Sequence, residues 1–284
     1  MLALNLERLQ TYRAATYHLR PELRVTTKEQ AVDFVDERGF VYFWPIKDVT
    51  MPSLWAAVAG DRPVPDEHDD PGHVTWRWKD EMLGARRWHY AKVLRKKATF
   101  IALGVVPTFY ALSENYGEPE EDYLLQYQEG RMTFEAKTVY ETLLKEGPLD
   151  SLSLRKAARL ASKESDSRFN RALEMLQGDF KVLPTGVSQA GAWKYAFIYD
   201  LVHRFYPDLP DRARPIRQAE ARRALAELYL RSVGIAQTRD FNMLFGWTKP
   251  DTEAAITALV QSGIALPNMT LADRPGEWIA LATL

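Results

Sequence analysis

The stretch FEAKTVYETLLKEGPLDSLSLRKAARLASKESDSRFNRALEMLQGDFKVLPTGV (residues 134–187) decides the fold, because it holds three helix patterns followed by an extended segment. Apolar residues recur at helical spacing in each pattern, and Gly147-Pro148 marks the first stop. The predicted elements are helices over Phe134–Glu146, Ser151–Leu160 and Ser167–Gly178, a strand over Phe180–Val187 and a returning strand over Trp193–Tyr199.

This order, in about 70 residues, is that of a winged helix, whose third helix normally enters the DNA major groove. The outer face of the predicted third helix carries side chains suited to phosphates and base edges, namely Ser167, Arg168, Asn170, Arg171 and Glu174. The same side chains could simply solubilise an exposed helix, because winged helices also serve as protein-protein scaffolds.

The rest of the chain extends this prediction on both sides. In the last part we expect helices over Ala219–Val233, Thr238–Phe245 and Asp251–Ser262, with strands over Ile264–Leu266 and Trp278–Leu281. In the first part we expect helices over Leu4–Leu19, Thr27–Arg38 and Met82–Leu103, with a short strand in Phe40–Ile46. The predicted class is mainly α with small β-hairpin wings (α+β), with tandem winged helices. The predicted domains are a helical, aromatic-rich domain over 1–125, with a divergent winged helix as the alternative for it, and winged helices over 131–207 and 215–284.

Composition excludes several functional classes. The 284 residues contain no cysteine, which removes disulfides and thiol chemistry, and no apolar run of about 18 residues. We found no Walker, Rossmann, nucleophile-elbow or zinc-peptidase motif and expect no cofactor, metal or membrane partner. We therefore expect a cytoplasmic protein, and the sequence does not predict its oligomeric state.

The net charge of −1 means that a nucleic-acid role requires a local basic patch. The segment WRWKDEMLGARRWHYAKVLRKK (residues 76–97) supplies one by interleaving Trp76, Trp78, Trp88 and Tyr90 with basic residues. These predicted DNA contacts are Arg77, Lys79, Arg86, Arg87, Lys92, Arg95, Lys96 and Lys97, alongside Arg168, Asn170 and Arg171. The alternative is an amphipathic helix whose basic side chains extend over an aromatic core.

An acidic turn, DEHDDPGHVTW (residues 66–76), contains carboxylates and histidines in a spacing typical of no metal site. We favour a solvated acidic turn around Pro71-Gly72 over a metal site, because Pro, Gly and Asp are themselves turn-forming residues. As weak acid-base candidates we take Asp48, Asp69, Asp70 and His73.

The layout resembles the winged-helix DNA glycosylases of the AlkZ/YcaQ type. The resemblance is carried by EARRALAELYLRSVGIAQTRDFNMLFGWTKPDTEAAITALVQSG (residues 220–263), KTVYETLLKEGPLDSLSLRKAARL (137–160) and, more weakly, SLWAAVAGDRP (53–63). It implies a protein related to enzymes that act on alkylated bases and crosslinks in DNA. That family carries a Gln-x-Gln or Gln-x-Asp motif, and the matching stretch GFVYFW (39–44) places Tyr42 and Trp44 on its two functional positions.

Three functions follow as hypotheses. The first is a double-stranded DNA-binding protein that recognises damaged or distorted duplex, with Tyr42 and Trp44 stacking on or wedging between bases. In that case the pair should line a cleft, whereas aromatic residues that only fill a buried strand should be sealed from solvent. The alternatives are a DNA glycosylase that excises alkylated bases with a noncanonical catalytic residue, Asp48, Asp69, Asp70 or His73, and a protein-interaction scaffold.

Overall fold

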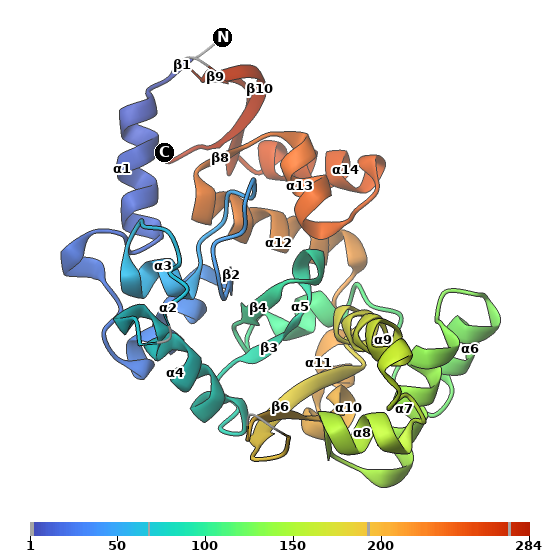
Figure 1. Cartoon of the computed structure of the whole chain (residues 1–284). Helices are drawn as coiled ribbons and strands as arrows, with labels where there is room; N and C mark the ends of the chain where they lie inside the picture. Colours follow the sequence, from blue (N-terminus) through green and yellow to red (C-terminus); the bar gives the residue numbers. More distant parts are fainter. Residues whose placement is uncertain (1–2, 68, 192–193, 272–273) are drawn as a thin grey trace. The chain divides into compact units, whose positions relative to one another are not determined.

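The computed structural model describes residues 3–67, 69–191, 194–271 and 274–284, in which helices alternate with small, mainly antiparallel sheets (Figure 1). The expected α+β class is confirmed. The chain divides into two compact units, of which the first comprises Met1–Trp78, Thr99–Val105 and Arg217–Leu284 and the second Lys79–Ala98 and Val106–Ile216. Three separate domains over 1–125, 131–207 and 215–284 stay a prediction. No helix in the described ranges is both long and apolar enough to cross a membrane.

The first unit joins the beginning of the chain to its end. Its elements are β1 (Ala3–Leu4), α1 (Leu6–Thr16), η1 (Pro21–Leu23), α2 (Lys28–Arg38), β2 (Phe40–Tyr42), α3 (Leu54–Ala59), η2 (Pro71–His73), the first half of α4 (Val74–Leu83), β4 (Ala98–Ile101), α12 (Gln218–Val233), β8 (Ile235–Ala236), α13 (Thr238–Phe245), α14 (Lys249–Gln261), β9 (Ala265–Leu271) and β10 (Arg274–Leu281). One sheet has the strand order β1-β9-β10-β8, in which β9 and β10 form an antiparallel hairpin, and β2 pairs antiparallel with β4 (Figure 1).

Side chains of α1 complete the C-terminal end of α12, where helix carbonyls lack intrahelical partners. Tyr12 donates to the carbonyl of Arg231 at 2.5 Å, and Thr16 donates to that of Ser232 at 2.8 Å. The Nε of Arg13 donates to the carbonyl of Val233 at 2.8 Å, which places a positive charge at the negative end of the helix dipole. These bonds join segments more than 200 positions apart in the sequence.

The second unit is built around residues 134–187. Its elements are β3 (His89–Lys92), η3 (Leu94–Lys96), α5 (Val106–Tyr110), α6 (Asp122–Gln128), α7 (Phe134–Glu146), β5 (Leu149–Asp150), α8 (Ser151–Ala157), η4 (Lys163–Ser165), α9 (Asp166–Gly178), β6 (Val182–Ser188), β7 (Ala196–Leu201), α10 (Val202–Phe205) and α11 (Leu209–Ala213). The sheet has the order β5-β7-β6. Its core consists of the inward faces of α7, α8 and α9 packed on β6 and β7.

Local patterns located most of these helices. The predicted helices over Phe134–Glu146 and Thr238–Phe245 have these bounds in the structure, and α9 begins one residue earlier than expected. Thr27 caps α2 in a capping box with Gln30, and Gly39 ends that helix at φ 80°. This backbone conformation favours glycine, and a Cβ at this position would also displace the Leu228 side chain, whose methyl group would lie 2.9 Å away.

The predicted helix over Met82–Leu103 is wrong. Helix α4 ends at Leu83, and the segment continues as β3, η3 and β4. In β3 the side chains of His89 and Ala91 are buried while those of Tyr90 and Lys92 are half-exposed, a period of two that favours a strand. The two predicted strand pairs are present as the antiparallel hairpins β6–β7 and β9–β10, although Trp193 lies outside the described residues.

Candidate nucleic-acid interface

Helix α9 presents a polar face formed by the side chains that its periodicity turns away from the core. Phe169, Leu173 and Leu176 are buried, whereas Arg168, Asn170 and Arg171 are exposed. The Arg168 guanidinium lies 3.4 Å from Glu135, and the Arg171 guanidinium bonds Ser167 of its own helix. Exposed and loosely paired guanidinium groups are able to contact phosphates.

The end of the basic segment packs against the same helix. The backbone N–H of Lys92 donates to Gln177 at 3.0 Å, and its ammonium group bonds Glu174 at 2.8 Å. Element η3 also contacts α9, and it carries Arg95 and Lys96, both exposed. The structure therefore packs the end of the basic segment, Lys92 and η3, against α9, a helix about 70 positions away whose exposed face also carries Arg168 and Arg171.

The backbone of η3 is unusual, because both exposed basic residues adopt the left-handed conformation. Arg95 has φ 52° and Lys96 has φ 58°. Residues other than glycine rarely take up such angles, and clustered strain is commonest at functional sites. We call the surface formed by Arg95, Lys96, Arg168, Asn170 and Arg171 the α9–η3 surface.

The other predicted basic contacts lie in varied surroundings. Lys79 is buried, with its ammonium group 2.7 Å from Asp80 and 2.8 Å from the Tyr195 hydroxyl, so its predicted DNA contact is wrong. Burial lowers the pKa of Lys79. Arg86, Arg87 and Lys97 are exposed in the second unit, where the Arg86 guanidinium lies 4.5 Å above the Phe205 ring. Arg77 is exposed in the first unit.

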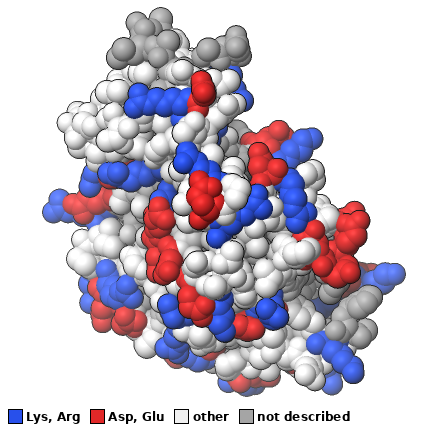
Figure 2. Space-filling view, turned by 90° about the vertical axis from the view of Figure 1, so that its left-hand side faces the viewer, with Lys and Arg blue, Asp and Glu red and all other residues white. Residues whose placement is uncertain are grey.

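The interleaved tryptophans do not form a stacking surface together. Trp78 and Trp88 are 6% and 1% exposed, whereas Trp76 is 44% exposed. The alternative interpretation, an aromatic core beneath basic side chains, therefore holds for Trp78 and Trp88. Charged groups are mixed on the face drawn in Figure 2, where basic and acidic side chains alternate without a continuous basic area.

The two motif-equivalent aromatics have different environments. Tyr42 lies in β2, opposite Thr99 of β4, and is 1% exposed. It is sealed from solvent, so its predicted stacking role is wrong, since β2 is buried on both faces. Trp44 follows the strand and is half-buried. Its ring centroid lies 5.7 Å from that of Trp76 and 5.8 Å from that of His73.

The acidic turn is held by its own hydrogen bonds. Asp70 accepts from the backbone N–H of Gly72 and from the Arg62 guanidinium, both at 2.7 Å. The hydrogen bond from Arg62 contributes most, and together these bonds hold the pKa of Asp70 below its ordinary value. Asp70 is therefore a poor proton donor. Asp69 is exposed, and His73 packs edge-on against Trp44. In the described residues, which exclude His68, no group of three carboxylate or histidine side chains is placed to hold a metal.

Asp48 lies elsewhere in the first unit, on the wall of a cavity of about 400 Å³. Asp48 is exposed and left-handed at φ 60°. The cavity is also lined by Arg13, Arg239, Asp240 and Arg274. These residues belong to α1, α13 and β10, and no local motif links them to Asp48, the one residue of the lining that the sequence indicates as a candidate.

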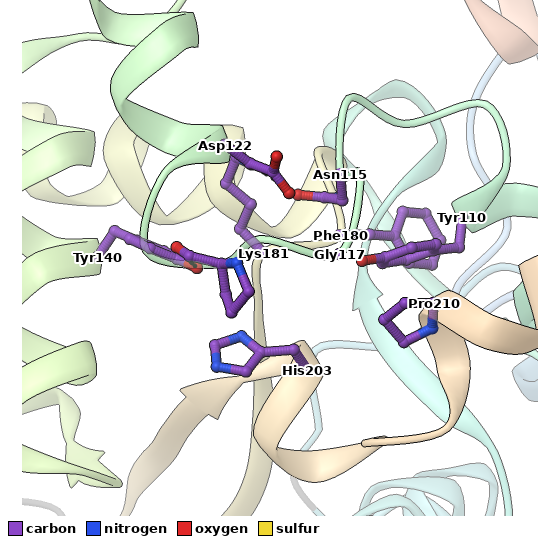
Figure 3. A pocket seen from close by; sticks show the side chains of 10 residues that line it. Tyr110, Asn115, Gly117, Asp122, Tyr140, Phe180, Lys181, His203 and Pro210 are labelled. Atoms are coloured by element: carbon purple, nitrogen blue, oxygen red, sulfur yellow. Dashed lines mark hydrogen bonds between the residues drawn. The ribbon is translucent and has the colours of Figure 1, made fainter. Parts of the chain in front are cut away.

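A second cavity lies in the second unit beside the buried Lys181 (Figure 3). The Lys181 ammonium group donates to Asn115 at 2.6 Å, and burial lowers its pKa to about 8. Asp122 accepts from the backbone N–H groups of Tyr116 and Glu118. The cavity volume of about 10 Å³ admits about one water molecule, so no substrate enters it.

Comparisons with known proteins agree with this architecture. The solved structure of the Streptomyces sahachiroi DNA glycosylase AlkZ is similar to this chain, with a TM-score of 0.61 and 15% sequence identity, covering 99% of this chain and 71% of that one. A search of the curated proteins gave no match. The model of the family described as AlkZ related matches residues 25–246. The chain belongs to the AlkZ-related family.

Proposed function

We propose that this protein binds double-stranded DNA through tandem winged helices, with α9 as a recognition helix. The segment from α7 to β7 has the order helix, strand, helix, helix, strand, strand, and its sheet has the first strand beside the last. The segment from α12 to β10 repeats both the element order and the strand order, with β8 beside β10. Both orders are those of a winged helix. This supports winged helices over 131–207 and 215–284.

The α9–η3 surface is the observation that carries this proposal. It combines a helix N-terminal half, where a recognition helix contacts base edges, with four exposed basic side chains that are able to contact phosphates. Asn170 lies between two arginines and has the amide needed to read an adenine edge.

We further propose that the preferred DNA is damaged or distorted. Membership of the AlkZ-related family and similarity to a protein named a DNA glycosylase support this preference. The half-buried Trp44 and the exposed Trp76 supply aromatic faces on which an unstacked base is able to rest. Tyr42 has no part in this. The cytoplasmic location expected from the sequence stays a prediction.

A fluorescence-anisotropy titration of a labelled duplex tests the proposal. Arg168→Ala combined with Arg171→Ala should weaken binding and reduce the slope of log affinity against log salt by about two, because two phosphate contacts are lost. Thermal stability should not change, since both side chains are exposed. The matched control is Arg212→Ala with Arg214→Ala, two exposed arginines of the same unit that pair with Asp208 and Asp211.

If the two double variants changed duplex affinity equally, α9 would not be part of the DNA interface. The absence of any duplex binding at low salt would leave the protein-interaction scaffold as the function. A comparison of plain duplex with duplex carrying an N7-alkylguanine then tests the preference for damage, and equal affinities for the two would contradict it.

A DNA glycosylase is the second candidate function, favoured by the position of Asp48 on the cavity wall. In the reaction, water attacks C1′ of the sugar, the bond to the base nitrogen breaks, and its electron pair leaves with the base. The Asp48 carboxylate would accept the proton of the water and stabilise the cationic sugar. Asp69, Asp70 and His73 do not line this cavity.

Incubation with DNA that carries an N7-alkylguanine separates the two functions, with abasic sites as the readout. We expect no excess over DNA without protein, because no Gln or Asp stands at the motif-equivalent positions Tyr42 and Trp44. Excision that disappears in Asp48→Asn but persists in Asp69→Asn would establish the glycosylase instead.

A further inference from the structure

A group of large apolar side chains is exposed on α6 and at the start of α7 in the second unit. Four of the twelve large apolar side chains that are exposed in the described residues lie within residues 116–134, namely Tyr116, Leu125, Tyr127 and Phe134. Phe134 is 65% exposed and Leu125 is 47% exposed. Single exposed apolar side chains are ordinary, whereas a contiguous group of them marks a contact with another molecule.

The apolar side chains are continuous across the two helices, which pack against each other (Figure 1). Around the axis of α6, the half-buried Leu124 lies between Leu125 and Tyr127. The Lys137 ammonium group lies 5.3 Å from the centroid of the Tyr127 ring, and Lys137 follows Phe134 by three positions on one face of α7. We call the surface formed by Leu124, Leu125, Tyr127 and Phe134 the α6–α7 surface.

The chain around this surface is strongly acidic. Between residues 98 and 130 it contains no lysine or arginine and six acidic residues, which are Glu114, Glu118, Glu120, Glu121, Asp122 and Glu129. Glu121 and Glu129 stand four positions before and after Leu125, at the two ends of α6. Positions four apart are neighbours on a helix, so carboxylates flank the apolar side chain on both sides.

Only part of this charge is neutralised within the fold. Arg131 pairs with Glu114 and Glu129. Lys137 pairs with Glu141 at 2.8 Å. Three exposed carboxylates have no ion pair among the described residues, namely Glu118, Glu120 and Glu121. The α6–α7 surface therefore has an apolar centre and an acidic rim.

This combination restricts the class of molecule that the surface is able to bind. An acidic rim repels DNA, RNA and anionic lipid surfaces. It also disfavours a symmetric dimer through this surface, because like charges would face each other. A protein helix with apolar side chains on one face and lysine or arginine beside them complements both the centre and the rim.

We propose that the α6–α7 surface docks a basic, amphipathic helix of a partner protein. The apolar face of that helix packs on Leu125, Tyr127 and Phe134, and its basic side chains lie opposite Glu118 and Glu121. The α6–α7 surface shares no residue with the α9–η3 surface, so this inference does not rest on the proposed binding of DNA.

Fluorescence anisotropy of the full chain with a labelled synthetic peptide tests the proposal. The probe is a peptide of about 18 residues with leucine and lysine at helical spacing, and its control has glutamate in place of every lysine. We expect the lysine peptide to bind at micromolar concentration and at least about tenfold more tightly than the glutamate peptide, because only the lysine peptide complements the acidic rim.

Two exposed apolar side chains supply the variant that locates this binding. Leu125→Ser with Phe134→Ser should weaken binding of the lysine peptide about tenfold or more, because the apolar centre is lost. The matched control is Leu152→Ser with Val187→Ser, two exposed apolar residues of the same unit outside this surface, and it should leave the affinity unchanged. The substituted side chains are exposed, so thermal unfolding of all these proteins should match the wild type.

The acidic rim gives a second measurement. Glu118→Gln with Glu121→Gln should weaken binding of the lysine peptide and lower its dependence on salt, since two charges of the rim are removed. Four results would overturn the proposal. They are no binding of the lysine peptide at low salt, equal binding of the two peptides, equal effects of Leu125→Ser with Phe134→Ser and of its control, and an unchanged salt dependence in the rim variant.

Sedimentation velocity at low salt tests the other possible occupant, a second copy of this chain. We expect the wild type and Leu125→Ser with Phe134→Ser to sediment alike. Self-association of the wild type that this variant abolishes would overturn the proposed partner and assign the α6–α7 surface to a contact between copies.

Discussion

His89 illustrates how one buried residue ties stability to pH. Its ring stacks on that of Phe180 at a centroid distance of 4.9 Å, and neither ring nitrogen has a hydrogen-bond partner within the described part of the chain. Burial lowers the pKa of His89 to about 3 from its ordinary 6.5. The unfolded chain therefore binds a proton between these values that the folded chain does not, and stability is lost as pH falls from 6.5 toward 3.

We expect His89→Phe to remove this acid sensitivity. Between about pH 7 and about pH 5 the wild type should lose about 2 kcal/mol more unfolding free energy than the variant. Guanidinium unfolding at both pH values measures the difference. His73→Phe, a change at a half-buried histidine, serves as the control, and equal acid sensitivity of His89→Phe and the wild type would contradict the prediction.

Lys181 gives the corresponding dependence at alkaline pH. Burial lowers its pKa to about 8 from 10.5, so the unfolded chain holds the extra proton between these values. The buried charge of Lys181 destabilises the folded state, and this destabilisation disappears as pH rises from 8 toward 10.5. We expect the unfolding free energy of the wild type, relative to Lys181→Met, to rise by about 2 kcal/mol between about pH 8 and about pH 10. Tyrosine ionisation is common to both proteins and cancels in the difference. A constant difference would show that the amine titrates normally.

At the scale of elements, substitutions in η3 distinguish its backbone strain from its proposed role in DNA binding. Arg95 and Lys96 are left-handed, a conformation that costs roughly 1–2 kcal/mol in a residue with a Cβ. We expect Arg95→Gly with Lys96→Gly to leave the unfolding free energy unchanged or to raise it by up to about 2 kcal/mol. Duplex affinity should fall and its salt slope decrease by about two, because both charges are lost. A loss of stability together with unchanged affinity would assign these residues to folding alone.

The element scale is also where sequence patterns failed. The segment Met82–Leu103 combines apolar and basic residues that suit an amphipathic helix, yet it forms β3, η3 and β4. Lys92 bonds Gln177 and Glu174 of α9, contacts that exist only after the two segments meet. Short strands depend on such partners more than on intrinsic preference, whereas helix α7 closes its own hydrogen bonds within 13 residues.

At the scale of the whole molecule, a net charge of −1 restricts DNA binding to a local surface. The four basic residues of the α9–η3 surface, at one phosphate each, give a slope of log affinity against log salt of about −3.6. We therefore expect duplex affinity to fall roughly 10²-fold between about 50 mM and about 200 mM salt. Anisotropy titrations across this range measure the slope. A slope near zero would indicate that phosphate contacts do not drive binding, as for a protein-interaction scaffold.

The sequence by itself determined the helices that carry clear local signals, such as α2 between Thr27 and Gly39, because periodic apolar residues and caps act within a few positions of the chain. Only the tertiary structure decided which polar and aromatic groups reach solvent. Tyr42 and Trp44 are two positions apart, yet one is sealed in β2 and the other is half-exposed, and Lys79 is buried whereas Arg77 is not. The cavity at Asp48 draws Arg13, Arg239 and Arg274 from both ends of the chain. Burial and convergence of this kind depend on contacts between distant segments, which no local pattern encodes.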